Sequence, residues 1–523
     1  MSVSDREPGG SPEPEPAPGA HAAATTASAT TAPPANAHPR RWLALLFVGL
    51  AQLMIVLDIT IVNIALPSAQ QDLHISAGDR QWVITAYTLA FGSLLLFGGR
   101  IADYTGRRRA FLIGLAGFAS ASALGGAAGD LGMLLAARAL QGAFAALLAP
   151  SALSLLAVMF TQAKERAKAF GIFGAIAAGG GALGLVLGGL LTEYLTWRWC
   201  LYVNVPIAIG ALFGWYALPA DTPTGGKRAR FDIPGVLLAV AGLVAVVYGC
   251  SEAESDGWDS GPVLGLLGAG VLLLAAFVVA EARARTPLLP LRVVLDRTRG
   301  GAYLAVGLSM VGMFAMFLFL TYYLQTVKDY SAVVTGVAFL PLTAGVLFGA
   351  GGVATRLIPR VPPRALVAPG LLLSASGVAW LIPLSPDSSY AGGVLPAELL
   401  VGMGMGLVMA PAMNYATHGV RPEDTGIASA SVTTAQQIGG SIGTALLNTI
   451  AASTTSDYLA AHHPPTPQVA KQALTEGFSD AFVVAALILA TAAVLVGLLM
   501  NTPRPRRDTT TAKDTDPTPA HLG

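Results

Sequence analysis

Apolar stretches of about bilayer length recur along the whole chain, and short segments that carry the charges separate them. A helix needs about 20 consecutive apolar residues to cross the hydrocarbon core of a membrane. The pattern therefore predicts an all-helical membrane protein. Fourteen spans are predicted, at residues 42–67, 79–99, 108–128, 131–158, 167–191, 199–219, 231–250, 262–281, 300–326, 333–355, 365–384, 391–415, 425–451 and 478–500.

The connecting segments alternate between rich and poor in Lys and Arg. Arg100, Arg107, Arg108 and Arg109 lie at the connection after the second predicted span. Basic residues follow at every second connection, as clusters except after the twelfth span, where Arg421 stands alone. The alternate connections hold Arg80, Arg198, Lys328 and Lys471. Because basic residues gather on the cytoplasmic side of short loops, we expect both termini in the cytoplasm and an even number of spans.

Composition supports a membrane protein and argues against other classes. Hydrophobic residues make up 54% of the chain and charged residues 12%, against about 25% charged in soluble domains. A net charge of +1 argues against nucleic acid as a partner. The wealth of Ala, Gly and Arg is typical of a bacterial protein, so we expect a bacterial cell membrane. The polar, Pro-rich tails at 1–41 and 501–523 are too poor in apolar residues to fold alone.

The sequence offers no catalytic or cofactor chemistry. Two cysteines, Cys200 and Cys250, make neither a disulfide framework nor a thiolate metal site. No spacing typical of a metal site, of a Ser/His/Asp set or of an ATP-binding phosphate loop is present. We therefore expect neither an enzyme nor an ATP-driven pump, and no metal or cofactor.

Three charged residues lie inside predicted spans and away from the span ends: Asp58 in the first, Arg138 in the fourth and Glu398 in the twelfth. Such residues are costly in lipid and usually face a cavity, a pathway or one another. A structural ion pair is the alternative for Asp58 and Arg138. Glu398 is about two turns inside its helix, which fits the rim of a cavity or an interface position equally well.

Six motifs, in order along residues 57–446, resemble those of one transporter group. They are LDITIVNIALP at Leu57–Pro67, GRIADYTGRRR at Gly99–Arg109, RALQG at Arg138–Gly142, WRWCLYVNVPIAIG at Trp197–Gly210, GMGMGLVMAP at Gly402–Pro411 and TGIASASVTTAQQIGGSIGTAL at Thr425–Leu446. Together they resemble the fourteen-helix drug:proton antiporter branch of the major facilitator superfamily, which comprises multidrug efflux transporters.

The resemblance implies a fold and its domain boundaries. We expect two six-helix bundles, at 42–219 and 298–500, related by a pseudo-twofold axis along the membrane normal. Two additional membrane helices are expected in the linker at 220–297. Substrate would then bind near the midplane and be exposed alternately to either side.

The motif between the second and third spans implies a cytoplasmic gating loop, formed by Gly99, Asp103, Gly106, Arg107 and Arg108. Asp103 is four residues before Arg107, a spacing at which the two side chains can pair. The glycines allow a tight turn. A plain topology anchor is the alternative.

The fifth predicted span departs from the group's Gly-Pro-x-x-Gly-Gly motif. Gly180, Gly184, Gly188 and Gly189 are present, but Leu185 stands at the proline position. Glycines four residues apart allow close helix packing, whereas the proline kink is lost. Antiport stays the favoured direction of coupling, and a transporter that is not an antiporter is the alternative.

We expect the proton gradient to drive transport through Asp58. Burial favours the protonated form of a carboxyl group, whereas an adjacent cation favours the charged form. A change in water access can therefore make the group bind or release a proton. Arg138 is the expected cation, with Gln141 one turn further along the same helix face.

Polar and aromatic residues in the spans are candidates for the substrate cavity, although such positions often make only helix contacts. The candidates are Gln52, Asn63, Gln81, Trp82, Tyr87, Gln141, Tyr322, Tyr323, Gln325, Asn414, Tyr415, Gln436 and Gln437, with Met310, Met313 and Met316. They suit small amphipathic molecules such as drugs or antibiotics. An exporter of one endogenous secondary metabolite or lipid is the alternative. No protein partner is implied, so we expect a monomer that binds its substrate and protons within the lipid bilayer.

Overall fold

The structure, a computed structural model, describes residues 40–500 apart from 161, 222–231, 285–286, 288, 359, 418–419, 421–424 and 463–465. The predicted tails at 1–41 and 501–523 lie almost wholly outside these residues. Every element assigned within the described ranges is a helix, as the apolar pattern predicts.

The helices follow one another with short connections. The first half contains α1 (Arg41–Asp72), η1 (Asp79–Gln81), α2 (Trp82–Thr105), α3 (Arg107–Gly126), α4 (Leu131–Met159), α5 (Ala163–Tyr194), α6 (Trp199–Tyr202), α7 (Asn204–Leu212) and η2 (Phe213–Tyr216). Two helices come next, α8 (Ile233–Asp256) and α9 (Gly261–Arg283). The second half contains α10 (Leu291–Val294), α11 (Arg297–Tyr322), η3 (Tyr323–Val327), α12 (Ala332–Ala338), α13 (Leu340–Leu347), η4 (Phe348–Ala354), α14 (Thr355–Leu357), α15 (Arg364–Trp380), η5 (Tyr390–Val394), α16 (Leu395–Thr417), α17 (Thr425–Ala461) and α18 (Pro467–Leu499).

Twelve helical segments in the described part of the chain are long and apolar enough to cross a membrane. The remaining two predicted spans, 365–384 and 425–451, correspond to α15 and α17. The first is a shorter apolar helix of 17 residues, and the second has 37 residues with many Ser and Thr. Both pack within the bundle, α15 against α16 and α18, and α17 against α11 and α2. The count of fourteen stays a prediction.

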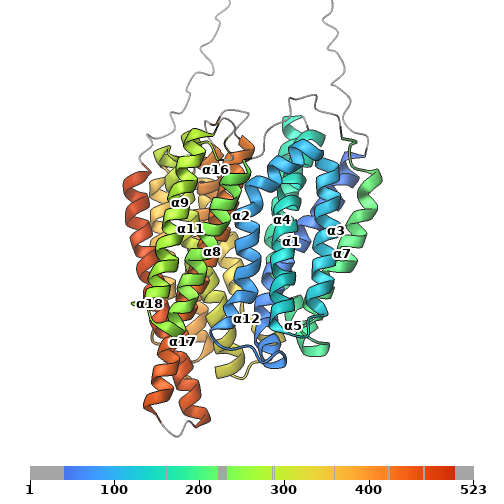
Figure 1. The fold of residues 1–523 in the computed structure, drawn as a ribbon. Coiled ribbons are helices and arrows are strands. Elements are labelled where there is room, and N and C mark those ends of the chain that lie inside the picture. The colour runs from blue at the N-terminus through green and yellow to red at the C-terminus, as the bar shows by residue number, and fades with distance from the viewer. Residues whose placement is uncertain are drawn as a thin grey trace, which may run out of the picture.

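Side-chain caps fix several helix starts. Asp130 accepts a hydrogen bond from the backbone N–H of Met133 at the start of α4, and Thr466 accepts one from Val469 at the start of α18. Such caps satisfy N–H groups that a helix leaves without partners. The predicted spans leave residues 452–477 as a long outer loop, but most of this segment is helical. Its Ala, Thr and Ser residues continue α17, and Thr466 with Pro467 starts α18, so a helical hairpin projects beyond the other helices (Figure 1).

The two halves lie side by side with roughly parallel helices, and α8 and α9 lie against their exterior (Figure 1). Helix α8 contacts both α2 of the first half and α17 of the second, whereas α9 packs mainly on α8. The inserted pair therefore covers the seam between α2 and α17.

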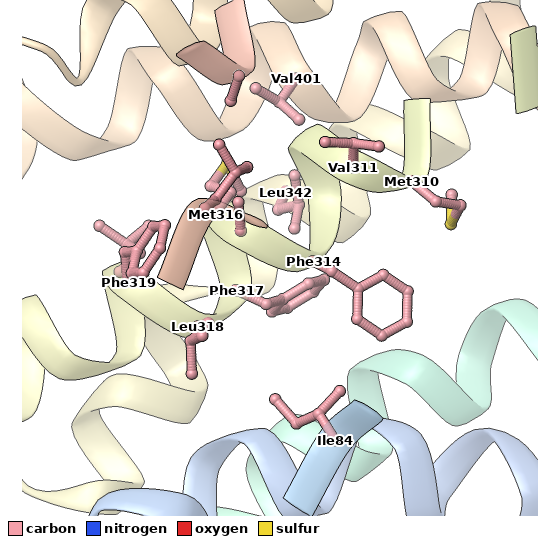
Figure 2. Packing of buried hydrophobic residues seen from close by; sticks show 14 of the residues in the cluster. Ile84, Met310, Val311, Phe314, Met316, Phe317, Leu318, Phe319, Leu342 and Val401 are labelled. Carbon is pink, nitrogen blue, oxygen red and sulfur yellow. The ribbon is translucent and has the colours of Figure 1, made fainter. Parts of the chain in front are cut away.

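One apolar cluster joins the two halves. It contains Ile84 of α2 together with residues of α11, α13, α16 and α18. Figure 2 shows Ile84 pointing toward Phe314 and Phe317 of α11. Met310 and Met316, candidates for the substrate cavity, lie in this cluster and are 7% and 0% exposed. They are core residues in this conformation.

Candidate functional site

A buried ion pair lies inside the N-terminal half. Helix α1 places Asp58 beside Arg138 of α4, with 2.6 Å between Oδ2 and Nη1. The two side chains are 0% and 2% exposed. Nε of Arg138 also donates to the backbone carbonyl of Val83 on α2 at 3.0 Å. Burying two charges requires both pairing and full hydrogen bonding, and the neighbouring side chains supply it.

Two amides complete the coordination of Asp58. Nε2 of Gln141 and Nδ2 of Asn204 donate to Oδ1 at 2.9 and 2.8 Å. Gln141 also accepts from Arg138 and donates to Ser122. The ring of Tyr87 lies 4.5 Å from the Arg138 guanidinium, a cation–π distance. We call Asp58, Arg138, Gln141, Asn204, Ser122 and Tyr87 the Asp58 network.

The sequence predicted part of this network. Arg138 was expected as the cation beside Asp58, with Gln141 one turn further along the same helix face. Gln141 and Tyr87 were also candidates for the substrate cavity. Asn204 was missed, although it is an amide within a quoted motif of an apolar segment, a signal that could have found it. Helix α3 contains several small residues, Ser and Ala, and no pattern in the sequence distinguishes Ser122 from the others.

The second buried acid has a different environment. Glu398 on α16 is 0% exposed, so it is not at an open cavity rim in this conformation. Its Oε2 lies 3.2 Å from the hydroxyl of Tyr390, and its Oε1 has no hydrogen-bond partner among the described residues. The same hydroxyl lies 2.6 Å from the backbone carbonyl of Ala338 at the end of α12. The described contacts of Glu398 include no ion pair.

Polar contacts join the two halves at the end where α1 finishes. The hydroxyl of Tyr322 donates to Oε1 of Gln70 at 2.5 Å, and Nε2 of Gln325 donates to the carbonyl of Ile64 at 3.0 Å. Arg80 donates to Asn448 at 2.9 Å. Glu193 of α5 accepts from the backbone N–H of Val333 on α12 at 3.0 Å. We call these contacts, with the α5–α12 packing, the outer seal, because the predicted orientation places this side outside the cell. They close this side of the protein between the halves.

The glycines of α5 pack against two neighbouring helices, α1 and α12. A Cβ added at Gly184 would lie 1.9 Å from Oγ1 of Thr60, and one added at Gly188 would lie 3.1 Å from Cα of Ile61, both on α1. Gly180 faces Leu53 and Val56 of α1, whereas Gly189 faces the backbone of Ala332 and Val333. Leu185 is 1% exposed. The ridge therefore packs α5 against α1, and its last glycine against α12.

The loop between α2 and α3, which is predicted to be cytoplasmic, has a partner that the sequence did not indicate. Gly106 has a φ of +102°, which favours glycine. The carboxylate of Asp221 accepts from the backbone N–H groups of Arg108 and Arg109 at 2.9 and 3.2 Å, and so caps α3. The side chain of Asp103 lies outside the part that the structure describes, so its predicted pairing with Arg107 stays a prediction. A Cβ added at Gly99 would make only ordinary contact with Pro150.

Several cavity candidates serve as contacts instead. Gln81 and Trp82 both donate to the hydroxyl of Ser251 on α8, at 2.9 and 3.1 Å. They therefore attach the inserted helix. Tyr322 and Gln325 belong to the outer seal, and Tyr323 donates to the carbonyl of Ser385.

The remaining candidates are spread through both halves. Asn63 donates to the carbonyl of Ile59 within α1, and Gln436 donates to Sδ of Met409. Gln437 is buried, Gln52, Met313 and Tyr415 are half-buried, and Asn414 is exposed. Among the residues that the structure describes, no cluster of three or more His, Cys, Asp or Glu could hold a metal ion.

Comparison with known proteins agrees with this arrangement. The profile of the Major Facilitator Superfamily matches residues 48–444. The puromycin resistance protein of Streptomyces alboniger is 52% identical over 481 residues, which are 92% of this chain and 95% of that protein. The cephamycin export protein of Amycolatopsis lactamdurans is 41% identical over 460 residues, 87% of this chain and 92% of that protein.

A solved structure is similar at the level of the fold. The bacterial homologue of the human lysosomal transporter Spinster has a TM-score of 0.63 at 17% identity, over 89% of this chain and 98% of that one. With the family match over most of the chain and this fold, the predicted family is confirmed: the protein is a multi-pass membrane protein and belongs to the Major Facilitator Superfamily of transporters.

Proposed function

We propose that the protein exports small antibiotic-like molecules across a bacterial cell membrane and that inward proton movement drives the export. The Asp58 network carries this proposal, because it places an acid in contact with a cation and two amides inside the first bundle of a transporter. The 52% identity to a puromycin resistance protein supports puromycin as the first substrate to test. The proposal needs no metal or cofactor.

The coupling follows from helix α1, which carries both Asp58 and outer-seal residues. Gln70 is twelve residues beyond Asp58 on the same helix, about 18 Å at 1.5 Å per residue. Opening the outer seal moves this helix relative to α11 and α12. When water reaches Asp58 from outside, a proton on the carboxyl removes the charge that Arg138 pairs with. Loss of the proton to the cytoplasm restores the pair.

The energetics are sufficient for useful accumulation. One charge that moves through about 100 mV releases about 2.3 kcal/mol. At about 1.4 kcal/mol per tenfold ratio, one proton per cycle supports a substrate gradient of about forty to fiftyfold.

A single-compound exporter is the second candidate function. The cephamycin export protein is named for one antibiotic, which favours export of one endogenous metabolite over broad efflux. A panel of unrelated antibiotics in one transport assay separates the two. Transport of several panel members supports multidrug efflux, whereas transport of one alone supports the narrower function.

The decisive experiment uses purified protein in vesicles with an internal pH-sensitive dye. Adding puromycin, or another antibiotic of the panel, should release protons on the side from which substrate binds. The matched control is Asp58→Asn, which keeps the side chain's shape but cannot exchange a proton at this position. Substrate movement with no linked proton movement in the parent protein would contradict the coupling.

We also propose that both termini are cytoplasmic and that the α17–α18 hairpin is external. Ser456 is exposed on the part of α17 that projects from the bundle. A cysteine at Ser456 should react with an impermeant thiol reagent in intact cells, whereas one at Thr509 should not. The parent, with its buried Cys200 and Cys250, is the control. External labelling at Thr509 would contradict the orientation.

A further inference from the structure

The contacts of Tyr390 determine where its single hydroxyl hydrogen lies. A phenol carries one hydrogen and can donate it to one oxygen at a time. The carbonyl of Ala338, at 2.6 Å, and Oε2 of Glu398, at 3.2 Å, both lie within reach. A carbonyl oxygen only accepts, and it is the nearer of the two. The hydroxyl therefore donates to Ala338, and the contact with Glu398 is a hydrogen bond only if Glu398 supplies the hydrogen.

The surroundings of Glu398 agree with a neutral side chain. It is fully buried, and its Oε1 has no hydrogen-bond partner among the described residues. An ionised carboxylate in that position would be costly. The helices packed on α16 carry their charges near their ends: Arg297 and Arg299 on α11, Arg364 on α15 and Asp457 on α17. Helices α12 and α13 carry none. Tyr390 touches Glu398, and Tyr330 is a further titratable side chain near Tyr390.

The acceptor of this hydrogen belongs to the outer seal. Ala338 is the last residue of α12, and carbonyls at the end of a helix need partners from outside it. Two residues earlier, a Cβ added at Gly336 would lie 2.2 Å from the carbonyl oxygen of Leu185 on α5. Val333 donates to Glu193 of the same helix. Tyr390 thus connects the start of α16 to the helix that closes against α5.

We propose that Glu398 is a second proton-binding site, which exchanges protons with the outer solution and controls the outer seal through Tyr390. With a proton on Glu398, the tyrosine hydrogen stays on Ala338 and holds α12 in the sealed position. When the proton leaves to outer water, the tyrosine donates to the carboxylate instead, because hydrogen bonds to a charged acceptor are stronger. The carbonyl of Ala338 then loses its partner, and α12 is released from α16.

The proton path of this proposal leads past η5 to a neighbouring groove. An open groove of about 760 Å³ adjoins η5, and Ser388, Ser389, Gly392 and Gly393 are among the residues that line it. Tyr390, between them, is half-buried. A proton from outside therefore favours the sealed form that the structure shows. The role in transport rests on the proposed function, but the site itself is tested below without substrate or gradient.

The test measures the opening of the seal. In a Cys200→Ala/Cys250→Ala background, Leu185→Cys places a thiol under α12, where a membrane-impermeant reagent reports outer opening. Its labelling rate should rise with external pH. Glu398→Gln, which retains a donor toward Tyr390 but cannot ionise, should label slowly and independently of pH. Tyr390→Phe should label about fivefold faster at acidic external pH, the ratio for a hydrogen bond of about 1 kcal/mol.

The matched control is Tyr323→Phe, which removes another phenol bonded to a carbonyl in the same half, that of Ser385, and does not touch the contact between Tyr390 and Glu398. It should keep the parent's dependence on pH. A Glu398→Gln protein with the parent's pH dependence would overturn the proposal, as would a Tyr390→Phe protein that labels at the parent's rate. If Glu398→Gln fails to fold, Tyr390→Phe alone decides.

Infrared spectroscopy tests the proton directly. The carbonyl-stretch band of a protonated carboxylic acid should be present in the parent and lost in Glu398→Gln at acidic pH. Its absence from the parent would overturn the assignment. Neither measurement depends on substrate, so a protein that transports without proton coupling can still pass both. Failure of the proposed function is therefore distinguishable from failure of this inference.

Discussion

Two acids are buried in the two halves of this transporter, and their surroundings differ. Asp58 is in contact with the guanidinium of Arg138 and accepts from two amides. Glu398 is in contact with one phenol and keeps one oxygen without a partner among the described residues. The first site is built for a charged carboxylate, the second for a neutral one. Similar burial therefore does not imply the same role, because the hydrogen-bond donors decide which form is stable.

The largest effect is expected from removing the cation. Arg138→Met would leave Asp58 buried without its partner, which costs about 3–5 kcal/mol. Glu398→Gln should cost less than about 1 kcal/mol, since the amide retains a donor toward Tyr390. Heat unfolding of both purified proteins in the same detergent measures the difference. Equal unfolding temperatures would show that the two sites are less different than the contacts indicate.

The next effect tests α5, which packs against α1, the helix of Asp58, and against α12, the helix to which Tyr390 donates. Gly184→Leu should abolish transport, because its side chain would enter the space occupied by Thr60. Gly181→Leu on the same helix is the control, since nothing lies within 4 Å of an added Cβ there. Leu185→Pro should be tolerated in comparison. Transport by Gly184→Leu at the parent's rate, or its loss in Gly181→Leu, would contradict this packing.

A smaller effect is expected at the amide that sequence reasoning missed. Asn204→Leu removes one donor to Asp58 and should cost about 1–3 kcal/mol. Asn63→Leu removes another buried amide of the same half, one that donates within its own helix and whose oxygen has no partner among the described residues. It should be close to neutral. Unfolding measurements in which Asn63→Leu is the more damaging change would contradict the importance of the amide shell.

The smallest effect is expected far from both acids. Asp221→Ala removes the cap of α3 and should lower stability by about 1 kcal/mol. The pH dependence of outer labelling should stay as in the parent. Changed labelling would show that the loop between α2 and α3 is coupled to the outer seal.

The sequence predicted what depends on local pattern. The length of the apolar stretches predicted the helices, and the charges inside those stretches singled out Asp58, Arg138 and Glu398. The ordered motifs indicated the family. What it could not predict depends on long-range packing: Asn204 reaches Asp58 from 146 positions away, and Asp221 caps a helix that begins far earlier in the chain. Gln81 and Trp82 were expected in the cavity but attach α8, because their polar partner is on an inserted helix.

The central claim is that Asp58 carries the coupled proton while Glu398 controls the outer seal. Substrate-induced proton release in vesicles, compared between Asp58→Asn and Glu398→Gln after both are shown to be folded, tests it most directly. The account predicts no proton release from Asp58→Asn. It predicts release from Glu398→Gln with a weakened dependence on external pH. Proton release by Asp58→Asn at the parent's rate would contradict it.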